Sequence, residues 1–250
     1  MEPLDVVKQA EGTQLRDKSG GVTTLKLLPP LSAAEIRAIE STIPCPLPEE
    51  ARELFSYCRG LEGAFEGAFG DDVQEVDFSG GLESGFGIEE IFPHAVPIVH
   101  DGAGNFWVVD LLRDSTCWGP IFYACHDAPV IVYQTDSLAH FISELLRLGN
   151  PPWESELAQV HGEYDGRIWT ENPGVMSHEQ CLRSGDADLE AFARSLDETW
   201  LFVDLRRPRL GDGFSWGRYG GGPETNRRFG EKRIFAYQQR KSFWQRVLGR

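Results

Sequence analysis

Histidine and cysteine side chains in the middle of the chain are the first candidates for chemistry. His94 and His100 flank one apolar run and His126 lies in a later turn, so a metal or acid–base site there is conceivable. The chain has no HxH, HExxH or equivalent spacing. Cys117 and Cys125 have no basic neighbour in sequence and no triad pattern. We therefore expect no catalytic residue, no bound metal and no cofactor.

The segment 100–105, HDGAGN, resembles a calcium-binding loop at first sight. An EF-hand loop needs acids or amides at alternate positions and a closing glutamate, whereas here only Asp101 and Asn105 offer side-chain oxygens. Asp-Gly and Gly-Asn are turn dipeptides, because glycine readily adopts positive φ. The segment therefore predicts a hairpin turn between strands at 95–99 and 106–112. Both strands are apolar almost throughout, which predicts that both faces of their sheet are covered.

An acidic segment precedes and includes this hairpin. Between positions 60 and 112 the chain has eleven Asp and Glu and no Lys or Arg. Several of the acids lie in loop-rich sequence beside aromatic residues, a pattern that suits an interface in which aromatics anchor and acids attract a basic partner. The alternative is a solvated acidic face. The candidate partner-binding residues are Glu62, Phe65, Glu66, Phe69, Asp71, Asp72, Glu75, Asp77, Glu83, Glu89 and Glu90.

The net charge of −15 is distributed unevenly along the chain. Positions 205–250 hold twelve Lys and Arg against three acids, so this basic tail carries +9 and positions 1–204 carry −24. An acidic body of this kind predicts a basic protein partner and disfavours nucleic acid and anionic membranes. The tail either remains separate or folds back and neutralises part of the body, and the sequence leaves both open.

Basic and aromatic residues alternate around the glycine-rich stretch at 217–222. Arg218, Arg227 and Arg228 lie near Trp216 and Tyr219, which is one way to bind single-stranded nucleic acid. The stretch lacks the GK[ST] ending of a phosphate-binding loop. We favour a loop whose arginines face water or the acidic body, since that body would repel nucleic acid.

Length and cysteine content point to an intracellular globular protein. A chain of 250 residues suits one large domain, or one domain with an appendage. Its five cysteines form no CxxC pair, no apolar run approaches the roughly 18 residues of a membrane span, and the first residues lack a signal-peptide pattern. We expect a cytoplasmic protein with free thiols.

The first 150 residues predict an α+β fold, an antiparallel sheet with helices packed on it. Helices are expected at 3–10, at 33–42 behind the capping box formed by Ser32 and Glu35, from Pro48 to a stop at Gly60, and after a cap at Thr135 or Asp136. Strands are expected at 22–28, 73–78, 86–91, 121–125 and 130–133, in addition to the hairpin. Gly149 and the following Asn-Pro-Pro form the clearest boundary.

The remaining residues predict a C-terminal α+β extension. Helices are expected at 153–160, 177–183, 187–196 and near 243–248, and strands at 200–205 and 234–237. This extension is either a separate lobe or an elaboration packed on the main sheet.

The order of these elements resembles the SUKH superfamily, which includes the fungal Smi/Knr cell-wall regulator and many bacterial toxin-immunity proteins. The matching pieces are LSAAEIRAIESTI with LPEEARELFSYCRGLEG, the hairpin VPIVHDGAGNFWVVDL, and VIVYQTDSLAHFISELL. At Arg59-Gly60-Leu61 the chain departs from the Asn-Gly of many members. The resemblance implies a SUKH-like domain at 22–149, followed by the extension at 150–250.

What the resemblance implies for function is a non-enzymatic protein-binding module. The leading expectation is an immunity protein that neutralises a cognate toxin, for example a nuclease, through its acidic face, since a nuclease needs a basic surface to hold nucleic acid. Two alternatives remain open: a regulatory scaffold that uses residues 150–250, and an enzyme whose site lies in that region.

Overall fold

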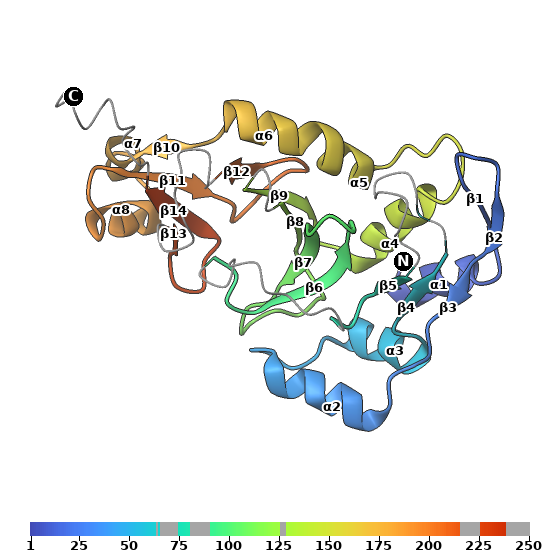
Figure 1. Ribbon diagram of the computed structural model, residues 1–250. Coiled ribbons are helices and arrows are strands. Elements are labelled where there is room, and N and C mark those ends of the chain that lie inside the picture. Colours follow the sequence, from blue (N-terminus) through green and yellow to red (C-terminus); the bar gives the residue numbers. More distant parts are fainter. Residues whose placement is uncertain (64, 66–74, 81–90, 126–128, 216–225, 239–250) are drawn as a thin grey trace.

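The computed structural model describes residues 1–63, 65, 75–80, 91–125, 129–215 and 226–238 (Figure 1). Its centre is a five-stranded antiparallel sheet in the order β12-β9-β8-β7-β6. The strands are β6 (Ala95–His100), β7 (Phe106–Asp110), β8 (Ile121–Cys125), β9 (Val130–Thr135) and β12 (Gly213–Ser215). The predicted hairpin is therefore confirmed, and it forms one side of the central sheet.

Alternate residues of the central strands face opposite ways, and both faces are buried. Trp107, Val109 and Tyr123 belong to one core cluster, whereas Val108 and Phe122 belong to another. The continuous apolar character of these strands thus reflects two covered faces, as the sequence predicted.

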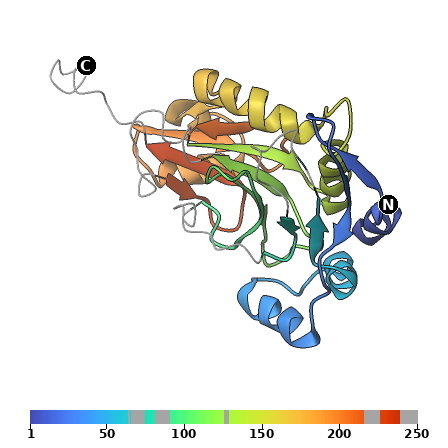
Figure 2. The same ribbon diagram turned by 45° about the vertical axis from the view of Figure 1, so that its right-hand side comes forward.

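Helices cover the first face of the central sheet. They are α1 (Pro3–Ala10), α3 (Glu49–Tyr57), α4 (Leu138–Arg147) and a continuous run of α5 (Glu156–Gln159), the π-helix η1 (Val160–Tyr164) and α6 (Asp165–Glu171). The helix α2 (Ala33–Thr42) lies at the periphery, beside α3 (Figure 2). Its bounds and its capping box match the prediction.

A second sheet covers the other face, in the order β10-β11-β14-β13. Its strands are β10 (Met176–Ser177), β11 (Trp200–Asp204), β13 (Asn226–Arg228) and β14 (Ile234–Gln238). Helices α7 (His178–Leu182) and α8 (Ala187–Arg194) pack on its outer side, at the left of Figure 1. The described chain therefore stacks helices, sheet, sheet and helices in four layers.

The C-terminal residues pack on the main sheet rather than standing apart. β12 pairs with β9, with Phe214 opposite Ile131. Phe235 and Tyr237 of β14 share a core with Phe122 of β8. Of the two arrangements that the sequence left open for the extension, the structure has the packed one.

Two small sheets complete the fold. The hairpin of β1 (Gln14–Arg16) and β2 (Val22–Thr24) lies near the N-terminus, and β3 (Lys26–Leu27), β4 (Gly60–Glu62) and β5 (Glu75–Asp77) form a three-stranded sheet. The single strand expected at 22–28 is thus two short strands in different sheets.

Some predicted boundaries are wrong for identifiable reasons. Helix α3 ends at Tyr57, because Cys58 is already extended, and Gly60 is a strand residue rather than a helix stop. A Cβ on Gly60 would lie 1.8 Å from the carbonyl oxygen of Val76, so glycine is required there by strand packing. The cap of α4 is Ser137, whose hydroxyl accepts the backbone N–H of His140, and not Thr135 or Asp136. Residues 86–90 of the strand expected at 86–91, and the helix near 243–248, lie outside the described residues, and Ile91 is in a turn.

Candidate functional site

The structure describes four of the eleven predicted partner-binding residues. Glu62 lies on β4, Glu75 and Asp77 lie on β5, and Phe65 follows β4. The other seven, Glu66, Phe69, Asp71, Asp72, Glu83, Glu89 and Glu90, lie outside the described residues. In the chain, all of these seven belong to the two segments on either side of β5.

Strand pairing brings two of the described acids face to face. Glu62 and Glu75 are directly opposite each other in the β4–β5 ladder, where two like charges repel. Lys26 of β3 lies opposite Glu62 on the other side, and its Nζ is 2.7 Å from Glu62 Oε1. Arg59 lies beside Glu75, at 3.8 Å. Both basic partners come from outside the 60–112 stretch, so the sequence pattern did not reveal them.

Asp77 stabilises the fold as well as contributing to the acidic surface. Its carboxylate is 3.1 Å from Arg59 Nε and accepts the backbone N–H and the hydroxyl of Ser79. The side chain is largely buried, at 11% exposed. Asp77 therefore fixes the turn after β5 and offers little free charge to a partner.

The aromatic residues of this stretch that the structure describes are core residues. Phe65 and Phe78 are fully buried, and the indole N–H of Trp118 donates to the carbonyl oxygen of Phe78 at 3.0 Å. Phe65 was predicted to anchor a partner, but it is not accessible, because it packs with Leu15 and Leu25 among the buried residues below β4. These buried phenylalanines lie beside the two acidic segments of the sequence, 66–74 and 81–90.

The end of the second acidic segment is held by the C-terminal extension. Ile91 and Phe92 are buried, and Arg228 Nη1 donates to the carbonyl oxygen of Ile91 at 3.0 Å. The described residues Phe65, Val76 and Ile91, which lie near the ends of the two acidic segments, are buried.

The burial and the distant partners of two carboxylates of the hairpin were not predicted from the sequence. Asp110, at the end of β7, is fully buried and receives a two-pronged contact from Arg228, at 2.8 and 3.0 Å. Arg233 Nε donates to the same carboxylate at 2.7 Å, and its Nη2 donates to the Asp110 carbonyl at 2.9 Å. Both arginines belong to the basic tail, so this part of the tail folds back on the body.

Asp101, in the hairpin turn, is the second buried carboxylate. It is 4% exposed and accepts from the backbone of Ala103 and Asn105, while its other oxygen lies 3.1 Å from His161 Nε2. Its role is to close the turn, as expected for the predicted hairpin. His161 was not singled out in the sequence, because 60 residues separate it from its partner.

The histidines and cysteines considered for chemistry are not assembled into a site in the described structure. His100 Nδ1 accepts the backbone N–H of Gly102 at 3.1 Å, and His126 lies outside the described residues. Within the described ranges, no group of three His, Cys, Asp or Glu side chains is placed to hold a metal ion. Burial raises the pKa of the Cys58 and Cys181 thiols to about 11 and also raises that of Cys117, which disfavours thiolate chemistry.

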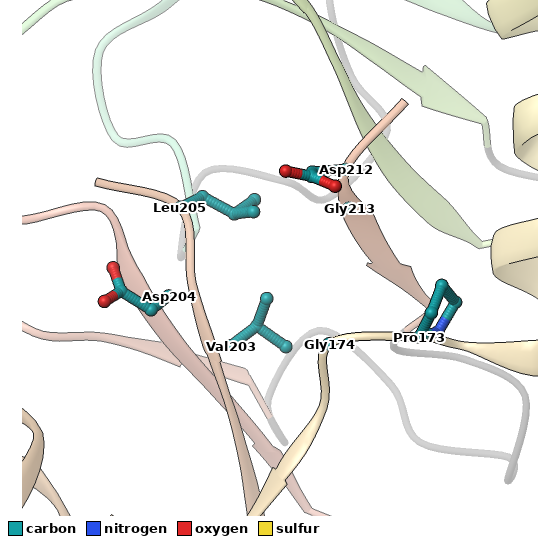
Figure 3. A pocket seen from close by; sticks show the side chains of 7 residues that line it. All are labelled: Pro173, Gly174, Val203, Asp204, Leu205, Asp212 and Gly213. Carbon is teal, nitrogen blue, oxygen red and sulfur yellow. The ribbon is translucent and has the colours of Figure 1, made fainter. Parts of the chain in front are cut away.

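Two hollows lie where β11 meets β12 and α8. The smaller, about 150 Å³, is lined by Pro173, Gly174, Val203, Asp204, Leu205, Asp212 and Gly213 (Figure 3). It is smaller than a usual small-molecule site, which occupies roughly 300–1,000 Å³. The larger, about 360 Å³, is lined by Asp186, Asp204, Arg206 and Arg207. Arg206 already binds both Asp186 and Asp204 there, so its walls are internally neutralised.

Comparison with known protein families gives a match for the first part of the chain. Residues 30–144 match the model of the SMI1/KNR4 family (SUKH-1). The match confirms the SUKH resemblance predicted from the sequence and the α+β class that it implies. The chain matched no curated protein and no solved structure. No helix among the described residues is long and apolar enough to cross a membrane.

Proposed function

Starting from a SUKH-1 domain at residues 30–144, we propose that the protein is a non-enzymatic binding module that neutralises a cognate bacterial toxin. The observation that carries this proposal is the acidic stretch at 60–112, which has eleven acids and no Lys or Arg and lies inside that domain. Asp77, Asp101 and Asp110 are buried and bonded within the chain, so the partner would be bound by the other eight acids. This stretch would bind a basic protein surface.

The physical basis is charge complementarity. A nuclease toxin needs a positive surface to hold the phosphates of its substrate. The carboxylates of the acidic stretch would take the place of those phosphates and cover the toxin's active site. Complementary charges chiefly accelerate encounter and exclude wrong partners, and exposed charges are screened beyond roughly 8 Å at physiological ionic strength. Affinity for the toxin should therefore fall steeply with added salt.

The experiment begins with the reading frame beside this gene, whose product is the candidate toxin. The two proteins are co-expressed, and their affinity is measured between 50 and 500 mM salt, conditions set around the roughly 150 mM of physiological solution. Reversal of Asp71, Asp72 and Glu75 to Lys should weaken binding and abolish protection of cells against the toxin. The control reverses Glu163, Glu171 and Glu198, which are exposed elsewhere and give the same change in net charge. A complex that is insensitive to salt and to the first set of reversals would contradict charge mimicry.

The scaffold alternative is tested by a different design. Its partner would bind the extension, yet β11 and β14 are buried between the central sheet and helices α7 and α8. Deletion of residues 150–250 would expose the core and cannot distinguish the two functions. Substitutions of exposed residues on α8 and on the acidic stretch, made separately in the full chain, can. A partner lost only with the α8 substitutions favours the scaffold.

A further inference from the structure

The π-helix η1 meets the hairpin turn through His161. The helix carries the wide-turn hydrogen bond from Asp165 N–H to the carbonyl of Val160. His161 Nε2 lies 3.1 Å from Asp101 Oδ2, and its imidazole stacks on Trp107 with ring centres 6.0 Å apart and planes at 19°. The edge of Tyr123 closes another side, at 5.5 Å. Single π-helical turns are rare and often mark functional positions.

Asp101 is ionised and can therefore pair with a positively charged group. Burial would raise its pKa, but the hydrogen bonds from His161, Asn105 and Ala103 outweigh burial and hold the pKa of Asp101 well below its usual range. The carboxylate is thus ionised at neutral pH. Since an ionised carboxylate only accepts hydrogen bonds, His161 Nε2 carries a hydrogen in this contact.

The other groups that face this imidazole are Asp165, Tyr123 and Trp107. Asp165 lies one helical turn beyond His161 and interacts with it electrostatically. Within the described residues, neither Asp101 nor Asp165 has a Lys or Arg ion-pair partner. The imidazole is 30% exposed, so protons can reach it.

We propose that the Asp101–His161 contact is a protonation-dependent latch, which fastens η1 of the C-terminal extension to the turn of the central hairpin. Imidazole is the side chain whose charge ordinarily changes between pH 5 and 8. When His161 gains a proton, a hydrogen bond to a carboxylate becomes an ion pair, and charged pairs of this kind are stronger. The latch tightens as pH falls from 8 towards 5.5. Because the pKa of Asp101 is depressed, the latch persists until acid strong enough to protonate this carboxylate.

His140 provides a matched control for His161. Its Nε2 lies 2.7 Å from Glu156 Oε2 and also joins two elements, α4 and α5. Glu156 is 34% exposed, whereas the Asp101 side chain is 2% exposed. Solvent therefore screens the His140 pair, and its loss should not loosen the hairpin turn.

The test is amide hydrogen exchange of Ala103 and Asn105, whose N–H groups donate to Asp101. After correction for intrinsic rates, their protection in the full chain should be about fivefold greater at pH 5.5 than at pH 8, the scale of one charge-assisted contact. H161Q retains a donor but cannot gain charge, so it should keep the fold and lose this pH dependence. H140Q should retain it. Equal pH dependence in H161Q and the parent chain would overturn the proposal, and so would its loss in H140Q.

A second measurement covers the case in which H161Q perturbs the fold. Imidazole NMR of the unaltered chain reports the protonation of His161 directly. The midpoint of that titration should coincide with the change in exchange at Ala103 and Asn105. Titration of His161 with no accompanying change at these amides would contradict the latch.

Discussion

At the scale of single residues, Asp110 is the side chain on which the stability of the fold depends most. It is fully buried between Arg228, 4% exposed, and Arg233, 18% exposed. Removing one member of a buried ionic cluster leaves the remaining charge uncompensated, which typically costs about 3–5 kcal/mol. We expect Asp110→Asn to lower the free energy of unfolding by about this amount, measured by urea denaturation.

The control for Asp110 is an ion pair on the surface. Glu179 and Arg183 are 2.9 Å apart and 70% and 79% exposed. Glu179→Gln should change stability by less than about 0.5 kcal/mol, because solvent screens such pairs. Equal effects from the two variants would mean that Asp110 is not the buried link described above.

Glu50 gives a residue-scale prediction that depends on pH. Its carboxylate accepts the backbone N–H of Trp118 at 2.6 Å, and burial raises its pKa. A carboxyl whose folded pKa is raised favours folding only while it is protonated, so its contribution is lost as pH rises through that pKa. Glu50→Gln keeps the acceptor without the charge. The variant should match the parent chain in acid and exceed it in stability at pH 7.

The control for Glu50 removes a charge from the exposed face of the same helix. Glu53→Gln should lack the gain at pH 7. Denaturation curves at pH 4 and pH 7 make the comparison. A gain of the same size in both variants would attribute the effect to net charge rather than to burial of Glu50.

At the scale of elements, the sequence predicted the helices and the hairpin whose structure depends on residues close together in the chain. The capping box of Ser32 and Glu35 defined α2, and a turn between two apolar runs defined the β6–β7 hairpin. Pairings between distant segments were not predictable, because nothing near β12 in sequence indicates that it joins β9. The helix expected at 153–160 begins only at Glu156, after its cap Ser155, and the helical run continues through η1 to Glu171. Packing of Val160 and Ile168 outweighs the helix-weakening Gly162 and Gly166.

The same distinction between local signals and contacts of distant segments applies to the candidate site. A run of acids without Lys or Arg is visible in the sequence, so the acidic stretch was recognisable. The partners that compensate some of those acids, Lys26 and Arg59, become neighbours only when β3, β4 and β5 pair. Burial of Phe65 is likewise a tertiary property that its acidic neighbours concealed.

Gly60 shows how one residue controls an element. In β4 it approaches the β5 backbone so closely that a Cβ would lie 1.8 Å from Val76 O. Gly60→Ala must separate β4 from β5, and we expect a loss of about 1–3 kcal/mol, the usual cost of overpacking. The control is Gly166→Ala, where a Cβ meets nothing within 4 Å, and a helical alanine should add about 0.5–1 kcal/mol. Urea denaturation of both variants tests the opposite signs.

At the scale of the whole molecule, the basic tail neutralises part of the charge of the acidic body. Asp110 of the acidic body binds two arginines of the basic tail, and Arg206 binds Asp186, Asp188 and Asp204. Much of the positive charge in the described part of the tail is thus paired with carboxylates of the same chain. The acidic stretch at 60–112 has no Lys or Arg of its own, and a basic partner binding there remains our proposal.

The extension should therefore be indispensable for folding, which a chain ending at residue 149 tests. It would uncover Val108, Phe122, Ala124, Ile131 and Tyr133, and it would leave Asp110 and Asp101 without Arg228, Arg233 and His161. Burial of one large apolar side chain contributes about 1.5–3 kcal/mol, so the loss rivals the roughly 5–15 kcal/mol stability of a whole domain. We expect aggregation, or no cooperative thermal transition by calorimetry. A chain ending at residue 238 keeps all of these contacts and should unfold cooperatively. Cooperative unfolding of the shorter chain would establish that residues 1–149, which include the match to the SMI1/KNR4 family, fold alone.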